Sequence, residues 1–216
     1  MTIRVARKKA DSYQHGDLKE ALVQAGLKLL SEEGLSGLSL RAAAQLAGVS
    51  HAAPYRHFAD KQALVAAIAE RGFRLLTASM REELAGCKAD DSVERLLALG
   101  VGYVRFATRH PDYLRVIFGG VICDQSSPPL QAAGEEAYNA LRDVVAAGLD
   151  RGELRGGDPD LVSLSCWSLV HGLSALLSSG AVPPPANESA LRELVLANLR
   201  LLSQGIDARD KAGQVD

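Results

Sequence analysis

The stretch that decides the fold runs from Leu38 to Leu64 and reads LSLRAAAQLAGVSHAAPYRHFADKQAL. Its first half has small and apolar residues at helical spacing, which predicts a short helix after Ser39. Gly48 then permits a left-handed turn, and Ser50 belongs to the residue types that cap a following helix. Two short helices joined by such a turn form a helix-turn-helix, and the second helix of that motif enters the major groove of DNA.

The second helix of this motif brings two groups of side chains to a DNA surface. The end that faces the base edges holds His51, Ala52 and Ala53. The side chains placed to hydrogen-bond phosphates, contacts that set position and carry little sequence information, are Tyr55, His57 and Lys61. Phe58 and Leu64 are expected in the core instead.

The rest of the chain has the pattern of an all-α protein with about nine helices. Apolar residues recur every three or four positions, and no segment alternates as a strand does. A long helix is expected from Lys61 to about Leu84. We therefore divide the chain into residues 1–60, an N-terminal arm with the helix-turn-helix, and residues 61–216, a helical C-terminal domain.

The charge balance is close to neutral, with 24 Lys+Arg against 26 Asp+Glu and a net charge of −2. It divides unevenly, since residues 1–61 hold nine basic and six acidic residues, for +3, and the remainder carries −5. With 47% apolar and 23% charged residues, the composition excludes wholesale disorder, a collagen-like repeat and a disulfide scaffold. A nucleic-acid surface, if present, is confined to the N-terminal part.

Residue types that carry catalysis or bind metals show no recognisable spacing. Cys87, Cys123 and Cys166 are odd in number and widely separated, which predicts reduced thiols in a cytosolic protein. The five histidines have no metal-ligand spacing. Since no nucleophile elbow, phosphate loop or paired-carboxylate motif is present, we expect no catalytic residues, no metal, no cofactor and no enzyme activity.

One stretch, Leu161 to Asn187, contains no charged residue and is long enough to span a bilayer. Six serines and the pair His171–Gly172 interrupt it, and no positive cluster flanks it. An uncharged helix can equally be buried inside a large protein or between subunits. We expect this helix to be buried inside the protein or between subunits, and hence we expect no membrane association.

The N-terminal part resembles the tetracycline-repressor (TetR) family of transcription regulators. The resemblance runs from Tyr13 to about Leu76 and rests on the helix YQHGDLKEALVQAGLKLLSEEG, the turn AGVS and the segment PYRHFADKQAL. A shorter match, WSLVHG at Trp167–Gly172, is similar to the Trp–His–Gly (WHG) core of one C-terminal subclass of that family.

The resemblance implies a homodimeric regulator, more often a repressor, that binds a palindromic operator and is released by a small-molecule effector. It places Ser39 and Arg41 on the supporting helix, at DNA backbone or bases. It places Ser50, His51, Ala52 and Ala53 at the base-reading end, and Tyr55, His57 and Lys61 at phosphates. It also suggests a minor-groove arm formed by Arg4, Arg7, Lys8 and Lys9. Dimerisation is expected through helices at Leu161–Val182 and Asn187–Ser203, packed as a four-helix bundle.

Pro54 departs from the family pattern. It has no N–H to donate, so the start of the second helix must loosen or shift by a residue. Ala52, Ala53 and Pro54 also lack side-chain donors. Base reading there is expected to use thymine methyl contacts, Arg41, His51 and DNA shape.

Effector-pocket candidates come from the C-terminal part. Trp167 and His171 are four residues apart and share one helix face. They either line an effector cavity or pack as a buried tryptophan with a satisfied histidine. The aromatic candidates beside them are Tyr103, Phe106, Tyr113, Phe118 and Tyr138.

The sequence leaves one alternative of another class. A helical sensor or interaction protein that no longer binds DNA would keep the same helix pattern. The expected function is an effector-responsive, DNA-binding transcription regulator in the cytoplasm.

Overall fold

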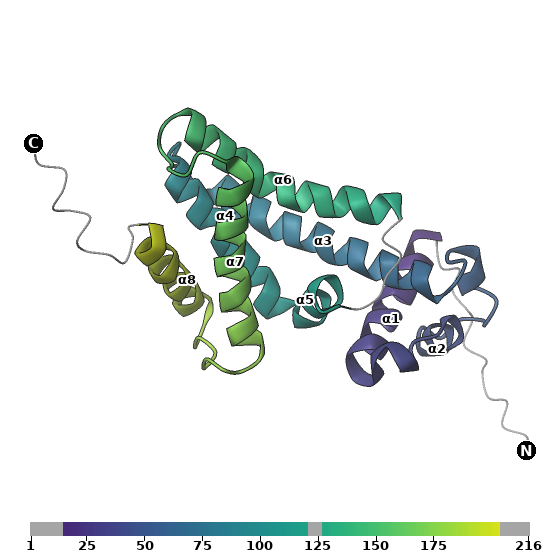
Figure 1. Ribbon diagram of the computed structural model, residues 1–216. Coiled ribbons are helices and arrows are strands. Elements are labelled where there is room, and N and C mark those ends of the chain that lie inside the picture. The colour runs from purple at the N-terminus through teal and green to yellow at the C-terminus, as the bar shows by residue number, and fades with distance from the viewer. Residues whose placement is uncertain (1–14, 121–126, 204–216) are drawn as a thin grey trace, which may run out of the picture. The chain divides into compact units, whose positions relative to one another are not determined.

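The computed structural model describes residues 15–120 and 127–203, and these residues form eight α-helices, one 3-10 turn and no strand (Figure 1). The elements are α1 His15–Gly37, α2 Leu40–Leu46, η1 Pro54–Arg56, α3 Lys61–Gly86, α4 Ser92–Arg109, α5 Pro111–Phe118, α6 Pro128–Asp150, α7 Pro159–Ser178 and α8 Glu188–Ser203. The all-α expectation is confirmed. The expected basic arm, at Arg4, Arg7, Lys8 and Lys9, lies outside the described residues.

The chain divides into two compact units, Met1–Ile68 and Ala69–Asp216. The border falls inside α3, eight residues beyond the division at residue 60 that the sequence suggests. The reason is that Leu64, Val65 and Ile68, in the first turns of α3, are buried and belong to the core of the first unit.

Close packing of α1 against the start of α3 builds the first unit. Leu22, Leu64 and Ile68 are fully buried. Gly26 makes the approach possible, because a Cβ there would lie 2.9 Å from Cδ1 of Ile68. The α1 helix breaks at Gly34, where φ is +70°, as its glycine predicts.

Polar caps fix the starts of three helices in the second unit. Oδ1 of Asp91 accepts the N–H of Glu94 at 3.0 Å before α4, and Oδ1 of Asp158 accepts the N–H of Asp160 at 2.9 Å before α7. Asn187 caps α8 in the same way, from the N–H of Ala190. Each cap satisfies a helix N–H that has no partner within the helix. Asp and Asn are among the residue types that favour this position.

The α4 helix is the centre of the second unit and packs against α5, α6, α7 and α8. Gly102 lets it approach α3, since a Cβ at this position would lie 2.6 Å from the backbone of Met80. A hydrogen bond joins the two helices at this place, since the hydroxyl of Ser79 donates to the carbonyl of Gly102 at 2.8 Å. Within this unit, α6 runs alongside α3, where Arg81 and Glu136 form an ion pair at 2.7 Å (Figure 1).

Candidate nucleic-acid interface and effector site

The supporting helix of the helix-turn-helix is α2. Its N-cap is Ser39, in extended conformation, whose Oγ accepts the N–H of Ala42 at 3.1 Å. Leu40, Ala43 and Ala44 are buried beneath the helix. The side chain of Arg41 points to the exposed side, so the cap and the hydrophobic contacts together present this guanidinium outward.

The turn after α2 forms as its sequence predicts. Gly48 has a φ of +71°, a left-handed conformation that glycine adopts without strain. The N–H of Val49 reaches back to the carbonyl of Ala44 at 3.0 Å and closes the turn. The chain then enters the segment that follows Ser50.

The second helix of the motif is shorter than expected. A regular helix from Ser50 is not found, and Pro54–Arg56 forms a single 3-10 turn that has no side-chain cap. The carbonyl of Ser50 accepts the N–H of Ala53 at 3.0 Å, and the carbonyl of Pro54 accepts the N–H groups of both His57 and Phe58 at 2.9 Å. The missing N–H of Pro54 breaks the hydrogen-bond series between these two turns, which is the shift its sequence position predicts.

Most of the predicted base-reading residues are accessible. Ser50, His51 and Ala52 are exposed, and Ala53 is half-buried. Pro54, next in the chain, is buried, so it anchors the segment and is not itself a reading residue. Short side chains therefore dominate this part of the surface.

The predicted phosphate-binding residues differ in their exposure and in their hydrogen bonds within the protein. Tyr55 is 55% exposed, while His57 is half-buried beside the Phe58 ring at 6.3 Å. The ammonium of Lys61 donates to the carbonyl of Leu35 at 2.9 Å. An ammonium has three donors, so this bond orients Lys61 and leaves donors for a further acceptor.

Arg56 is a basic residue on this surface that the sequence analysis did not select. It is exposed, lies in η1 directly after Tyr55, and is the one Lys or Arg between Arg41 and Lys61. That isolated position in an otherwise uncharged reading segment is the signal that identifies it.

In the second unit, five side chains from four helices form an aromatic cluster. The Phe118 ring lies 5.8 Å from Phe73, 5.5 Å from Trp167 and 5.0 Å from His171. Tyr103 completes the aromatic cluster from α4, with its ring 6.3 Å from His171. The structure thus brings together Tyr103, Phe118, Trp167 and His171 from the predicted set and adds Phe73 from α3.

Hydrogen bonds connect the polar atoms of the aromatic cluster. Nε1 of Trp167 donates to Oη of Tyr103 at 3.2 Å, and the same oxygen lies 2.8 Å from Nδ1 of His171. Burial raises the pKa of Tyr103 to about 12, although the bond from Trp167 acts in the opposite direction. The phenol is therefore protonated at neutral pH.

The other three predicted pocket residues lie elsewhere in the unit. Phe106 and Tyr113 are buried and flank His110, with ring centroids at 5.6 and 6.2 Å from it. Tyr138 is separate, since its hydroxyl donates to Asp160 at 3.2 Å, beside an ion pair of Arg142 and Asp160 at 2.7 Å. Tyr138 thus fastens α6 to the start of α7.

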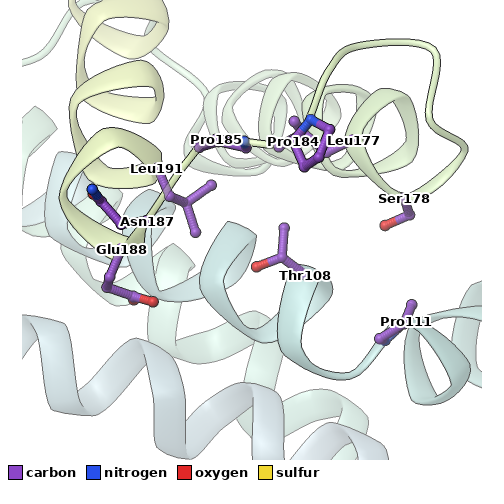
Figure 2. A pocket seen from close by; sticks show the side chains of 9 residues that line it. All are labelled: Thr108, Pro111, Leu177, Ser178, Pro184, Pro185, Asn187, Glu188 and Leu191. Carbon is purple, nitrogen blue, oxygen red and sulfur yellow. The ribbon is translucent and has the colours of Figure 1, made fainter.

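An open hollow of about 370 Å³ occurs between α4, α5 and the connection from α7 to α8 (Figure 2). Its lining residues are Thr108, Pro111, Leu177, Ser178, Pro184, Pro185, Asn187, Glu188 and Leu191. None of the seven predicted pocket residues lines it. Three of its polar side chains already have partners, since Asn187 caps α8, Glu188 pairs with Arg109 at 3.1 Å, and the hydroxyl of Thr108 donates to the carbonyl of Val104 at 3.1 Å.

The α7 helix, which carries no charged residue from Leu161 onward, is less buried than its composition suggests. Its buried residues are Ser163, Val170, Ser174 and Leu177, while Leu161, Leu164 and Leu176 are about half exposed. Serines occupy inward positions because they are small enough for close contact, and Ser174 donates to the carbonyl of Val170 at 2.7 Å. On length and composition, α7 is the one helix in the described ranges that is apolar enough to cross a membrane.

Among the described residues, no group of three His, Cys, Asp or Glu side chains is placed to hold a metal ion. Cys87 and Cys166 are free thiols, and burial raises the pKa of Cys166. Cys123 lies outside the described residues.

An N-terminal helix-turn-helix unit followed by a separate helical unit defines the class of two-unit helix-turn-helix regulators. Residues 22–68 match the family model for bacterial regulatory proteins of the tetR family, and residues 96–199 match the tetracyclin repressor-like C-terminal domain. The chain belongs to the TetR family of transcription regulators.

Relatives of known sequence agree with this assignment. An HTH-type transcriptional regulator of Mycobacterium tuberculosis is 24% identical over 156 residues, which cover 71% of this chain and 65% of the relative. The chain thus spans about two-thirds of the length of that curated relative. The class C tetracycline repressor protein of Escherichia coli is 42% identical over 52 residues, 24% of each chain.

Solved structures share the fold. A Rhodococcus sp. RHA1 protein with unknown function has a TM-score of 0.72 at 30% identity, covering 90% of this chain and 100% of the other. The regulator FadR of Bacillus subtilis, in complex with stearoyl-CoA, has a TM-score of 0.70 at 16% identity, with coverages of 87% and 99%. At 16% identity, the similarity to FadR shows a shared fold alone.

Proposed function

We propose that this regulator is a cytoplasmic repressor that binds a palindromic operator as a homodimer and is released by a small-molecule effector. The observation that carries the proposal is the outward presentation of Ser50, His51, Ala52 and Tyr55 by the segment between Gly48 and η1, within the residues that match the tetR family model.

The proposed DNA contacts divide into two groups. Tyr55, Arg56, His57 and Lys61 supply donors for phosphates, which fix the position of the unit on the duplex. Ser50, His51, Ala52 and Ala53 lie where bases are read, with Ser39 and Arg41 on the supporting helix. Two alanine methyl groups favour contact with thymine methyls, so we expect A·T pairs opposite them.

The proposed homodimer is built from α7 and α8. An apolar face that a monomer leaves exposed marks an interaction surface, and α7 exposes Leu161, Leu164 and Leu176 without any charged residue between them. On α8, Leu201 is 57% exposed. Both helices pack on α4, so two copies joined through them would form a four-helix bundle. A subunit interface also accounts for the membrane-like composition of α7.

Release by an effector requires that the ligand prefer a conformation that fits the operator less well. The proposed site for such a ligand is the aromatic cluster, because it is the place where partly exposed rings and hydrogen-bonding groups from α3, α4, α5 and α7 meet. In the fold relative FadR, a ligand of the acyl-CoA class is bound. That relative supports a ligand-binding role for the helical unit.

Selection of DNA from a random pool with the purified full chain tests the proposal. We expect an enriched palindrome whose half-site centres lie about 34–36 Å apart, since two identical units must enter successive major grooves. Enrichment of no palindrome would instead favour a helical sensor that does not bind DNA. The matched control is the variant Tyr55→Ala with Arg56→Ala, which keeps the buried Pro54 and should lose enrichment.

A further inference from the structure

The hydrogen bonds inside the aromatic cluster have a defined direction. An indole N–H only donates, so Oη of Tyr103 accepts from Trp167. Tyr103 is 5% exposed, and its own hydroxyl proton therefore needs an acceptor inside the protein. Nδ1 of His171, 2.8 Å away, is that acceptor. The donor order runs from Trp167 to Tyr103 to His171.

This order fixes the tautomer of His171. A neutral imidazole that accepts at Nδ1 carries its proton on Nε2. Within the described ranges, no hydrogen bond to Nε2 of His171 is formed, and the side chain is partly exposed. The opposite tautomer would leave the hydroxyl proton of Tyr103 buried without an acceptor, which is unfavourable.

The rings that contact His171 are flat and largely apolar. Phe118 lies edge-on to His171 at 5.0 Å and tilted against Trp167 at 5.5 Å, and both Phe118 and Trp167 are partly exposed. Aromatic faces favour stacked or edge contacts with other flat rings. No carboxylate belongs to the aromatic cluster, so a cationic ligand would meet no opposite charge there.

We infer that the aromatic cluster binds a flat, apolar molecule that presents one hydrogen-bond acceptor, a carbonyl or similar oxygen, to the Nε2–H of His171. The inference rests on the proposed function, because it names the chemical class of the effector. Trp167 and Tyr103 act as positioning residues, since they hold His171 in the donor tautomer.

The tautomer is measured directly by nitrogen NMR of the full chain labelled with ¹⁵N-histidine, at alkaline pH where a free imidazole is neutral. The expected spectrum shows a protonated Nε2 and an unprotonated Nδ1 for His171. A proton on Nδ1 overturns the inference. In the variant Tyr103→Phe the preference for one tautomer should disappear, whereas Tyr138→Phe, which removes a hydroxyl outside the aromatic cluster, should preserve it.

Ligand preference is tested with two probes of similar size, coumarin, which has a carbonyl acceptor, and naphthalene, which has none. Trp167 is the single tryptophan of the chain, so its indole N–H signal reports binding at this place alone. Coumarin should bind more tightly than naphthalene, by a factor on the order of five, which is what one net hydrogen bond supplies. Equal affinity, or no shift of the indole signal with coumarin, overturns the inference.

The variant His171→Asn separates a positioning role from packing. Asparagine retains an oxygen that can accept from Tyr103 but is too short to carry a donor to the place of Nε2. We expect it to fold, to bind naphthalene as before and to lose the preference for coumarin. A preserved preference in folded His171→Asn contradicts the assigned donor.

Failure of this inference and failure of the proposed function are distinguishable. The tautomer and the probe preference are measured without DNA, whereas operator selection is measured without a probe. A selected palindrome together with a wrong tautomer overturns the ligand class alone. A correct tautomer with no selected DNA overturns the proposed function alone.

Discussion

The guanidinium of Arg105 lies 2.8 Å from the carboxylate of Glu83, and the two side chains are only 11% and 13% exposed. Glu83 also pairs with Arg192 of α8, so one carboxylate joins α3, α4 and α8. An ion pair this deep pays a desolvation cost that only its partners offset. Removal of one partner is therefore more damaging than at the surface.

We expect Arg105→Leu to lower the free energy of unfolding by about 3 kcal/mol, because it leaves a buried carboxylate with one fewer partner. Denaturant titration measures this loss. The control is Arg115→Leu, which removes an exposed pair with Asp112 and should change stability by less than about 1 kcal/mol. Equal losses in the two variants would show that the buried pair contributes no more than the surface pair.

Gly102→Ala should destabilise the second unit. The added Cβ would meet the backbone of Met80 at 2.6 Å, and backbone yields less readily than a side chain. The expected loss is about 1–3 kcal/mol, typical of overpacking, measured by thermal or denaturant unfolding. Gly86→Ala on α3, where nothing lies within 4 Å, should show no such loss.

Leu164→Arg or Leu176→Arg should convert the proposed dimer to monomers. Both leucines are about half exposed on α7, so a charge there costs the isolated chain little but would be buried at a subunit interface. Sedimentation velocity measures the change, and operator affinity should fall with it. Leu46→Arg, at an exposed leucine of the first unit, should leave the sedimentation coefficient unchanged. An unaltered profile for both α7 variants would place the interface on other helices.

Arg56→Gln should weaken operator binding at every sequence alike. If Arg56 contacts one phosphate, the slope of log affinity against log salt should decrease by about one. Fluorescence anisotropy at several salt concentrations measures both quantities. Lys88→Gln, an exposed residue of the second unit, provides the control and should retain the slope. A change in base preference with an unchanged slope would instead make Arg56 a base-reading residue.

Stability should fall on acidification because of His110. Burial, followed by the nearby Arg109 and Arg71 charges, lowers the pKa of His110 below its ordinary 6.5. Below about pH 6.5 the imidazole of His110 therefore binds a proton more readily in the unfolded chain than in the folded chain. The free energy of unfolding has its full value above about pH 6.5 and decreases as the pH falls from there toward the folded pKa. Unfolding titrations over this range should show the decrease. In His110→Asn, which suits the N-cap position before α5, the dependence should be smaller.

Local chemistry was the part of the fold that the sequence predicted well. Asp91, Asp158 and Asn187 start helices where their capping side chains predict, because a cap depends on neighbours two or three residues away. The position of Pro54 likewise predicted a disturbed second helix. How far the disturbance went, to one 3-10 turn, also depended on the burial of the proline ring.

Sequence patterns did not predict which side chains of the second unit contact one another. Tyr103 and His171 are 68 residues apart. The sequence left Trp167 and His171 either lining an effector cavity or packing as a buried tryptophan with a satisfied histidine, and it did not show that Tyr103 hydrogen-bonds to both. Tyr138 is an aromatic residue of the C-terminal part, as Tyr103 is, yet its hydroxyl donates to Asp160 at the start of α7. Helix packing decides which aromatic residues meet, and an aromatic residue type alone does not.

The α7 helix carries Trp167 and His171 on one side and Ser165, Gly172 and Leu176 on another, exposed side. Because helical periodicity keeps these sets on separate faces, mutations can accumulate independently on each. After gene duplication, one copy could acquire a new ligand preference while still pairing with its sibling, or lose that pairing while keeping its ligand. Paralogues of this regulator are thus expected to diverge independently in ligand preference and in subunit pairing, through substitutions on different faces of α7.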